Sequence, residues 1–198
     1  MRLIMRIKNI RVYNFEELNP EARSRVLRDY ADINTDFNWY EDELDYWKEK
    51  LSEYGFRYPE INFSGFWSQG DGACFEFNGL DIDKIWPHYV QSGQIKHEES
   101  IKTYLREYHH FKTRTLNSRY SHERTREVDY ESYTRHDYPH LNREFKRFED
   151  WLEGFRIDLC HEIYRNLENE YEALTEDTAI IETIKANEYE FTEDGLIA

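Results

Sequence analysis

The stretch Phe63-Ser-Gly-Phe-Trp-Ser-Gln-Gly-Asp-Gly-Ala-Cys-Phe75 crowds three glycines and four aromatic residues between two segments of strand-like composition. Glycine admits positive φ angles and close backbone approach, and Gly70 and Gly72 stand on either side of Asp71. We therefore expect a tight turn in which each of these glycines has a positive φ or unusually close neighbours. With strands expected at 60–64 and 74–77, the stretch predicts a β-hairpin with a long, structured connection.

Outward from this hairpin, hydrophobic periodicity and capping residues predict the remaining elements. Asn19 followed by Pro20 is a helix start, and Thr175 is expected to cap a last short helix that ends at Ala186. Further helices are expected at 20–32, 36–53, 139–173 and twice between 82 and 108, and strands at 6–13, 111–116, 120–130 and, as an edge strand or tail, 189–197. This order predicts an α+β fold, a single domain over residues 1–198, with a mainly antiparallel sheet of hairpins packed with several helices, including one long C-terminal helix.

Composition and charge limit the functions that the chain can have. Aromatic residues make up 17% of the sequence, which predicts a core built from rings. The two cysteines form no CxxC pair, and no apolar leader or segment of about 20 apolar residues occurs, so we expect the cytoplasm of a host cell and no membrane contact. Residues 148–198 hold 15 acidic and 3 basic residues, which accounts for −12 of the net charge of −15. Such acidity disfavours direct binding of nucleic acid and favours a protein partner with a basic surface.

The stretch from Phe66 to Gly72 is the first candidate contact site. Its backbone N–H groups can face a phosphate or a base, with Asp71 as ligand or general base, but it lacks the lysine of a phosphate-binding loop. A rigid turn in which Asp71 and Gln69 bond neighbouring backbone is the other interpretation. On an expected strand, Tyr120 and His122 share one face, where they can either contact a ligand or pack across the sheet. The candidate contact residues are Phe66, Trp67, Gln69, Gly70, Asp71, Gly72, Tyr120 and His122.

Signs of catalytic or metal chemistry are weak. His161-Glu162 begins a zinc-protease helix motif, but position 165 is Arg, so we expect no metal and no cofactor. Cys74 lies beside Phe75 and is interpreted as a small buried hydrophobe, and no nucleophile elbow surrounds Ser64 or Ser68. We predict no catalytic residues.

The motif Phe63-Ser-Gly-Phe-Trp-Ser-Gln-Gly-Asp-Gly-Ala73 resembles the signature of a family of small proteins from phages and prophages, some of which are labelled antitoxin-like. The resemblance extends over most of the chain, through Phe15-Glu-Glu-Leu18, Asp32-Ile-Asn34, Arg119-Tyr-Ser-His122 and Asn187-Glu-Tyr-Glu-Phe-Thr-Glu-Asp-Gly195. It implies a phage or prophage origin and an accessory protein that acts by binding.

These observations lead to the hypothesis of a non-enzymatic, acidic phage protein that binds and inhibits a host defence or nucleic-acid-processing protein. The expected acidic partner surface comprises Glu162, Glu168, Glu172, Glu176 and Asp177, although such a run is also typical of a solvated helix face. Two alternatives stay open. One is a nucleotide-binding protein or small nucleotide-directed enzyme that uses the 66–72 loop, and the other is an antitoxin-like neutraliser of a toxin.

Overall fold

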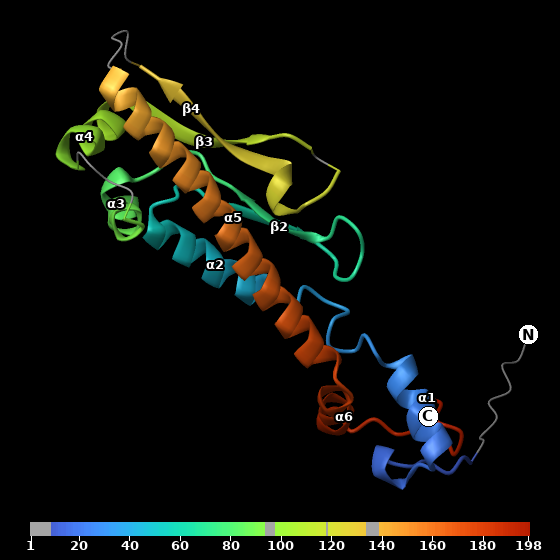
Figure 1. Cartoon of the computed structure of the whole chain (residues 1–198). Helices are drawn as coiled ribbons and strands as arrows, with labels where there is room; N and C mark the ends of the chain where they lie inside the picture. The colour runs from blue at the N-terminus through green and yellow to red at the C-terminus, as the bar shows by residue number, and fades with distance from the viewer. Residues whose placement is uncertain (1–8, 94–97, 118, 134–138) are drawn as a thin grey trace, which may run out of the picture. The chain divides into compact units, whose positions relative to one another are not determined.

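The computed structural model describes residues 9–93, 98–117, 119–133 and 139–198 and confirms the α+β fold (Figure 1). Its helices are α1 (Pro20–Asp29), α2 (Glu41–Tyr54), α3 (Ile82–Gln91), α4 (Glu98–Tyr108), α5 (Pro139–Thr175) and α6 (Asp177–Ala186), with short 3-10 turns η1 (Phe15–Glu17) and η2 (Glu123–Thr125). The strands are β1 (Glu60–Ser64), β2 (Gly72–Glu76), β3 (His109–Thr115) and β4 (Arg126–Ser132). β1 pairs with β2 and β3 pairs with β4, both antiparallel.

The contacts of the chain divide it into two compact units. Residues up to Trp39 form the smaller unit together with Asn169–Ala198, and Tyr40–Glu168 form the larger unit. The single domain expected from the sequence stays a prediction.

Local sequence signals explain where several helices begin and end. The side chain of Asn19 accepts a hydrogen bond from the backbone N–H of Ala22 at 2.9 Å, which confirms the expected start of α1. Asp81 caps α3 in the same way, through the N–H groups of Asp83 and Lys84. α2 ends at Gly55, whose φ of +107° closes the last turn.

The core of the larger unit is built from aromatic rings, as the composition predicted. The ring of Phe56 lies 5.0 Å from that of Phe75, and Phe148 packs against Phe111 at 5.5 Å and Tyr89 at 5.1 Å. These rings come from α2–β1, β2, β3, α3 and α5, so the 139–168 part of α5 packs against both hairpins and the preceding helices (Figure 1).

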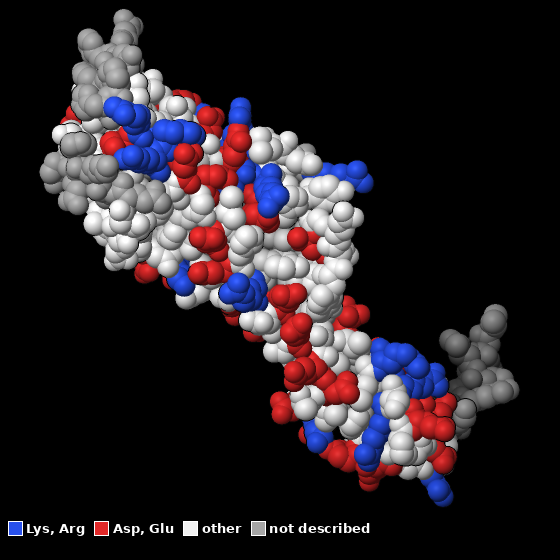
Figure 2. All heavy atoms as spheres, in the orientation of Figure 1, with Lys and Arg blue, Asp and Glu red and all other residues white. Residues whose placement is uncertain are grey.

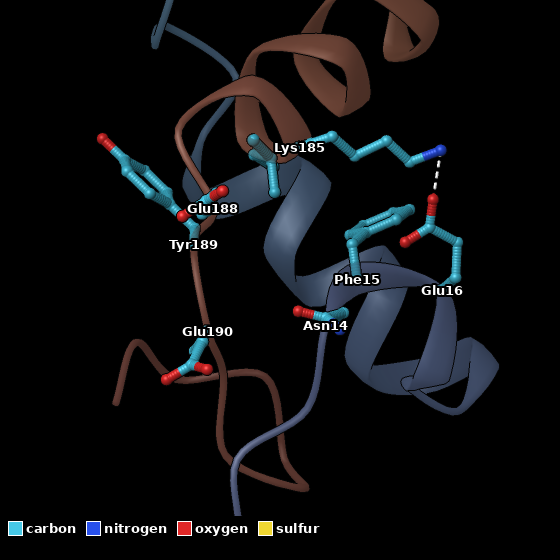
Figure 3. A pocket seen from close by; sticks show the side chains of 8 residues that line it. Asn14, Phe15, Glu16, Lys185, Glu188, Tyr189 and Glu190 are labelled. Atoms are coloured by element: carbon cyan, nitrogen blue, oxygen red, sulfur yellow. Dashed lines mark ion pairs between the residues drawn. The ribbon is translucent and has the colours of Figure 1, made fainter.

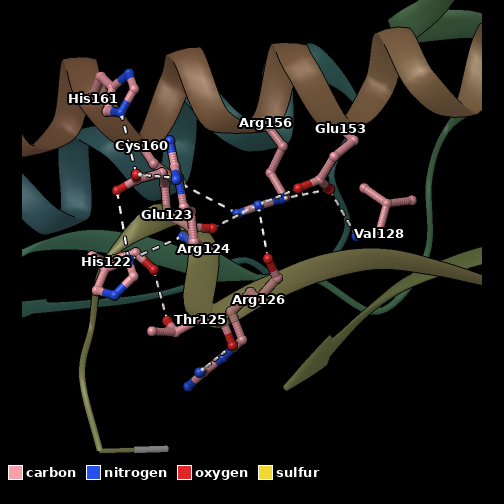
Figure 4. A network of polar contacts seen from close by, with 10 residues as sticks. All are labelled: His122, Glu123, Arg124, Thr125, Arg126, Val128, Glu153, Arg156, Cys160 and His161. Carbon is pink, nitrogen blue, oxygen red and sulfur yellow. Dashed lines mark hydrogen bonds and ion pairs between the residues drawn. The ribbon is translucent and has the colours of Figure 1, made fainter. Parts of the chain in front are cut away.

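A fully buried arginine connects α5 to the segment that leads into β4. The side chain of Arg156 is 0% exposed, and its guanidinium donates to the backbone oxygens of Glu123 at 2.7 Å and Arg126 at 2.9 Å (Figure 4). Glu153 pairs with the same guanidinium at 2.6 Å and also accepts a hydrogen bond from the N–H of Val128 at 2.8 Å. Burial alone lowers the pKa of Arg156, but the Glu153 carboxylate more than offsets this, so the pKa is raised and the group is charged.

The core of the smaller unit is aliphatic for the most part. Side chains from η1, α1, α6 and the C-terminal segment bury one another there, and they are Phe15, Leu18, Ala22, Val26, Ile180, Ile184 and Phe191. Asn34 is also buried in this unit, where its amide donates to the backbone oxygen of Leu174 at 2.9 Å and accepts from the hydroxyl of Thr183 at 2.7 Å. Tyr13 pairs with Phe191 in an isolated antiparallel bridge.

Four expected elements differ from the structure. Of the expected strand 6–13, residues 1–8 lie outside the described part, and among residues 9–13 the only strand pairing is the bridge at Tyr13. The helix expected from residue 36 begins at Glu41, after a turn. The strand expected at 120–130 begins at Arg126, because residues 123–125 form the η2 turn, in which the side chain of Thr125 bonds the backbone oxygen of His122. Thr175 does not cap α6 but ends α5, where its hydroxyl donates to the Tyr171 oxygen at 2.8 Å, and Glu176 takes the capping position.

Loss of the buried guanidinium should destabilise the larger unit. We expect Arg156→Met to lower the free energy of unfolding by about 2 to 3 kcal/mol, because it leaves the oxygens of Glu123 and Arg126 without their donor. The exposed Arg165 on the same helix is the matched control, and Arg165→Met should change stability by less than about 0.5 kcal/mol. Urea unfolding followed by circular dichroism measures both values, and equal stabilities would contradict the role assigned to Arg156.

His109, the first residue of β3, should make stability depend on pH. Its ring lies 4.5 Å from that of Phe145 and 4.7 Å from that of Tyr104, and burial lowers the pKa of His109 below its usual 6.5. The unfolded chain therefore binds a proton at a pH where the folded chain does not, and this histidine destabilises the fold as the pH falls below about 6.5. Between pH 8 and 5, the wild type should lose more stability than His109→Phe in urea unfolding, and parallel losses would count against this assignment.

Candidate functional site

The connection between β1 and β2 is a turn fixed by its own polar groups. The N–H of Asp71 donates to the oxygen of Ser68 at 3.1 Å, and the Asp71 carboxylate accepts a hydrogen bond from the N–H of Ser68 at 2.7 Å. Gly70 has a φ of +94°, which a residue with a Cβ adopts at a cost. The carboxylate of Asp71 therefore stabilises the turn, which is the rigid-turn interpretation of the sequence motif.

Trp67 is held in an exposed position at this turn. It has a φ of +68°, and its side chain is 67% exposed. A left-handed conformation costs a bulky residue about 1 kcal/mol or more, so the surrounding contacts must impose it. Phe66 supplies one such contact, because its ring lies 5.5 Å from that of Tyr164 on α5, and the backbone of Trp67 bonds the Tyr164 hydroxyl.

Tyr120 and His122 pack against this turn, although neither lies on a strand. A methyl group on Gly70 would lie 3.0 Å from the ring of Tyr120, and one on Gly72 would lie 2.5 Å from the Cβ of His122. Gly70 has the predicted positive φ, and Gly72 has the predicted close neighbour instead, so the expectation for both glycines is confirmed. The structure thus brings the candidate residues of the 66–72 loop next to Tyr120 and His122. We call Phe66–Gly72 with Arg119–His122 the loop surface.

A charged cluster borders the loop surface. The carboxylate of Glu123 lies 3.8 Å from Nδ1 of His122 and 3.8 Å from Nε2 of His161 (Figure 4). Nδ1 of His122 also accepts a hydrogen bond from the N–H of Arg124 at 3.2 Å. Because Arg156 holds the backbone of Glu123, this cluster is anchored to α5. His161 and Tyr164 were not predicted as neighbours of this site, since only the fold brings α5 to residues 63–72 and 120–123.

Two polar side chains of the loop surface accept hydrogen bonds from local backbone, through the carboxylate of Asp71 and Nδ1 of His122. Cys74 and Cys160 are buried, and burial raises the pKa of both thiols, that of Cys160 to about 12. The interpretation of Cys74 as a small buried hydrophobe is confirmed.

The acidic candidates are distributed over both units. Glu162 and Glu168 belong to the larger unit, where Glu162 is exposed and Glu168 is half-buried beside Tyr164. Glu172, Glu176 and Asp177 belong to the smaller unit and are exposed. Figure 2 shows acidic side chains gathered over the C-terminal part of α5.

The smaller unit has a hollow that the sequence did not indicate. It measures about 500 Å³, and its wall includes Phe15, Ile184 and Tyr189 (Figure 3). Lys185 pairs with Glu16 beside it, and this hydrogen bond lowers the pKa of the Glu16 carboxyl. η1, α6 and the C-terminal segment meet here, so no local motif could have marked the hollow.

The described part of the chain has neither a candidate metal site nor a candidate membrane-spanning helix. Among residues 9–93, 98–117, 119–133 and 139–198, no group of three or more histidine, cysteine or acidic side chains is placed to hold a metal ion. Within the same residues, no helix has the length and apolar character to cross a membrane.

The glycine contacts can be tested with a matched pair of substitutions. Gly72→Ala should lower the free energy of unfolding by about 1 kcal/mol or more, because its Cβ meets the backbone-linked Cβ of His122. Gly154 lies inside α5 with nothing within 4 Å of an added Cβ. Gly154→Ala should therefore raise stability by about 0.5 to 1 kcal/mol. Both values come from urea unfolding, and a neutral Gly72→Ala would show that the loop surface is loosely packed.

A sequence profile of one protein family matches this chain. The family is described as Domain of unknown function (DUF8835), and the match covers residues 39–177, more than two thirds of the chain, so the chain belongs to this family. The matched region includes the loop surface and the acidic residues Glu162, Glu168, Glu172, Glu176 and Asp177. No curated protein and no solved structure matches the chain.

Proposed function

We propose that this member of the DUF8835 family is a non-enzymatic binding protein that occupies a basic surface of a partner protein and blocks it. The observation that carries the proposal is Trp67, which is exposed, conformationally strained and fixed on a rigid turn. The ring of Trp67 lies 5.7 Å from that of Phe66 but stays largely exposed, and strained backbone of this kind clusters at functional sites. Tryptophan, tyrosine and arginine dominate binding energy at protein interfaces, and the loop surface presents Trp67, Tyr120 and Arg119.

Preorganisation is the physical advantage of this arrangement. A side chain that is already ordered loses little conformational entropy when a partner covers it. The Asp71–Ser68 bonds fix the turn, Phe66 packs on Tyr164, and the guanidinium of Arg119 lies 5.4 Å from the centre of the Tyr120 ring. These contacts leave the loop surface ready to bind without rearrangement.

Acidic side chains supply the preference for a basic partner. Glu162 and Glu168 lie on α5 in the same unit as the loop surface. The charge of Glu168 helps to raise the pKa of Tyr164, and the ring of Tyr164 packs against Phe66 of the loop. The net charge of −15 adds a long-range field that speeds the encounter with a positive surface. The further proposed acidic partner residues Glu172, Glu176 and Asp177 are exposed on the smaller unit and add to the negative charge.

The class of target comes from the resemblance to phage and prophage proteins. It suggests a host defence or nucleic-acid-processing protein, since such proteins carry basic grooves for phosphate backbones. The nucleotide-directed alternative has less support, because the carboxylate of Asp71 and Nδ1 of His122 already accept local hydrogen bonds. Neutralisation of a toxin would use the same mode of binding and differs only in the target.

A binding experiment with two variants tests this function. Proteins captured from host lysate by the wild-type chain are compared by mass spectrometry with those captured by Trp67→Gly, which keeps the turn because glycine accepts a φ of +68°. We expect Trp67→Gly to weaken binding of the purified target about tenfold or more, mainly through faster dissociation. Phe37→Ala, which removes a similarly exposed ring (66%) of the smaller unit, is the matched control and should bind normally.

A separate variant tests the contribution of the acidic side chains to binding. Reversal of Glu168, Glu172 and Glu176 to Lys should slow association and flatten its dependence on salt, with stability changed by about 0.5 kcal/mol or less per site. Surface plasmon resonance at about 0.05 to 0.5 M salt measures the association and dissociation rates. This range suits the test because the Debye length shrinks from about 10 Å at 0.1 M to about 3 Å at 1 M. Binding of the target that is unchanged by Trp67→Gly and by the three charge reversals would refute the proposed binding surface.

A further inference from the structure

In the two hairpins of the larger unit, buried apolar residues alternate with charged residues, although Cys74 of β2 is also buried. Ile61, Phe75 and Phe111 are buried, and rings of α5 cover Phe111. Because side chains alternate along a strand, the neighbouring residues point the other way. That face carries carboxylates from β1, β2 and β4 and basic side chains from β3, namely Glu60, Glu76, Glu131, His110 and Lys112.

A hollow of about 650 Å³ lies on this polar face, and two exposed tyrosines line it. Tyr58 is 78% exposed and Tyr133 is 64% exposed. Tyr58 also has a φ of +54°, although it precedes Pro59 and carries a bulky side chain. Backbone hydrogen bonds on its N-terminal side fix it there, because Arg57 bonds Gly79 at 2.9 Å and Asn78 at 3.0 Å. The hollow therefore has a rigid aromatic side.

The charges that line the hollow leave one carboxylate without a cation. Glu60 and Glu76 stand directly opposite each other in the β1–β2 register, where like charges repel. The nearly buried guanidinium of Arg126 pairs with Glu76, and Lys112 pairs with Glu131. Within the described residues, Glu60 is exposed and makes no ion pair. The hollow is therefore net acidic, and Glu60 lines it together with both tyrosines.

We propose that this hollow binds an arginine side chain of a partner protein. Its guanidinium pairs with the Glu60 carboxylate and stacks on the faces of Tyr58 and Tyr133. A planar, weakly hydrated guanidinium suits this combination better than an ammonium group, because it can make parallel hydrogen bonds to a carboxylate while it lies on a ring. The site shares no residue with the loop surface. It therefore goes beyond the proposed function, and the two proposals can be tested independently.

Nuclear magnetic resonance can test the site with a defined probe. The full chain, labelled with ¹⁵N, is titrated with the blocked peptide acetyl-Gly-Arg-Gly-amide and with matched peptides in which citrulline or lysine replaces arginine. We expect shifts at Tyr58, Glu60 and Tyr133, with the arginine peptide binding about tenfold more tightly than the neutral citrulline peptide. Equal shifts from the citrulline peptide would overturn the charge pairing, and equal affinity for the lysine peptide would overturn the assignment of arginine.

Three variants separate a specific site from general acidity. Tyr58→Gly should abolish most of the binding without loss of thermal stability, because glycine adopts a φ of +54° without strain. Glu60→Gln should abolish it as well, whereas Glu162→Gln, which removes an exposed carboxylate of α5, should leave it unchanged. Equal losses from Glu60→Gln and Glu162→Gln would show diffuse attraction and refute the site. Trp67→Gly should not change binding of the arginine peptide. A negative result for the arginine site can therefore be distinguished from a negative result for the loop surface.

Discussion

The buried charge of Arg156 is the constraint on which the candidate surfaces of the larger unit depend. A guanidinium without access to water is tolerated only when its donors are satisfied, and here the satisfying groups come from the η2 turn, from β4 and from Glu153. The position of η2 relative to α5 follows from this requirement. Tyr120 and His122 immediately precede η2, so the arginine also determines where they can lie.

A second constraint is steric and involves the absence of a side chain. Gly72 lets the backbone of β2 approach His122, and Gly70 lets the turn approach the ring of Tyr120. Two connections that are far apart in sequence can share one surface only because these positions lack a Cβ. The hydrogen bonds of Asp71 then make the turn rigid, which explains why an acid stands between the two glycines.

The exposed aromatic residues have a common explanation. Trp67 and Tyr58 both adopt left-handed backbone conformations and both direct large rings to solvent. Neither ring is part of the buried core, although the ring of Trp67 lies 5.7 Å from that of Phe66. The proposed binding would account for this combination, since a rigid ring covered by a partner contributes apolar area with little loss of entropy. Together with the acidic composition, this supports the proposal that the protein recognises basic partners through preformed surfaces.

The sequence by itself determined the elements whose signals are local. Asn19 and Pro20 set the start of α1, the repeated apolar residues set α5, and the glycines around Asp71 predicted the special turn correctly. Only the tertiary structure decided which of these segments meet. Residues 120–122 were wrongly expected on a strand, because the side-chain and backbone bonds of His122 and Thr125 replace the strand with a turn. The burial of Arg156 depends on contacts between distant segments, which neither helical periodicity nor strand alternation specifies. Even within the expected hairpin, only the structure fixed the register that sets Glu60 opposite Glu76.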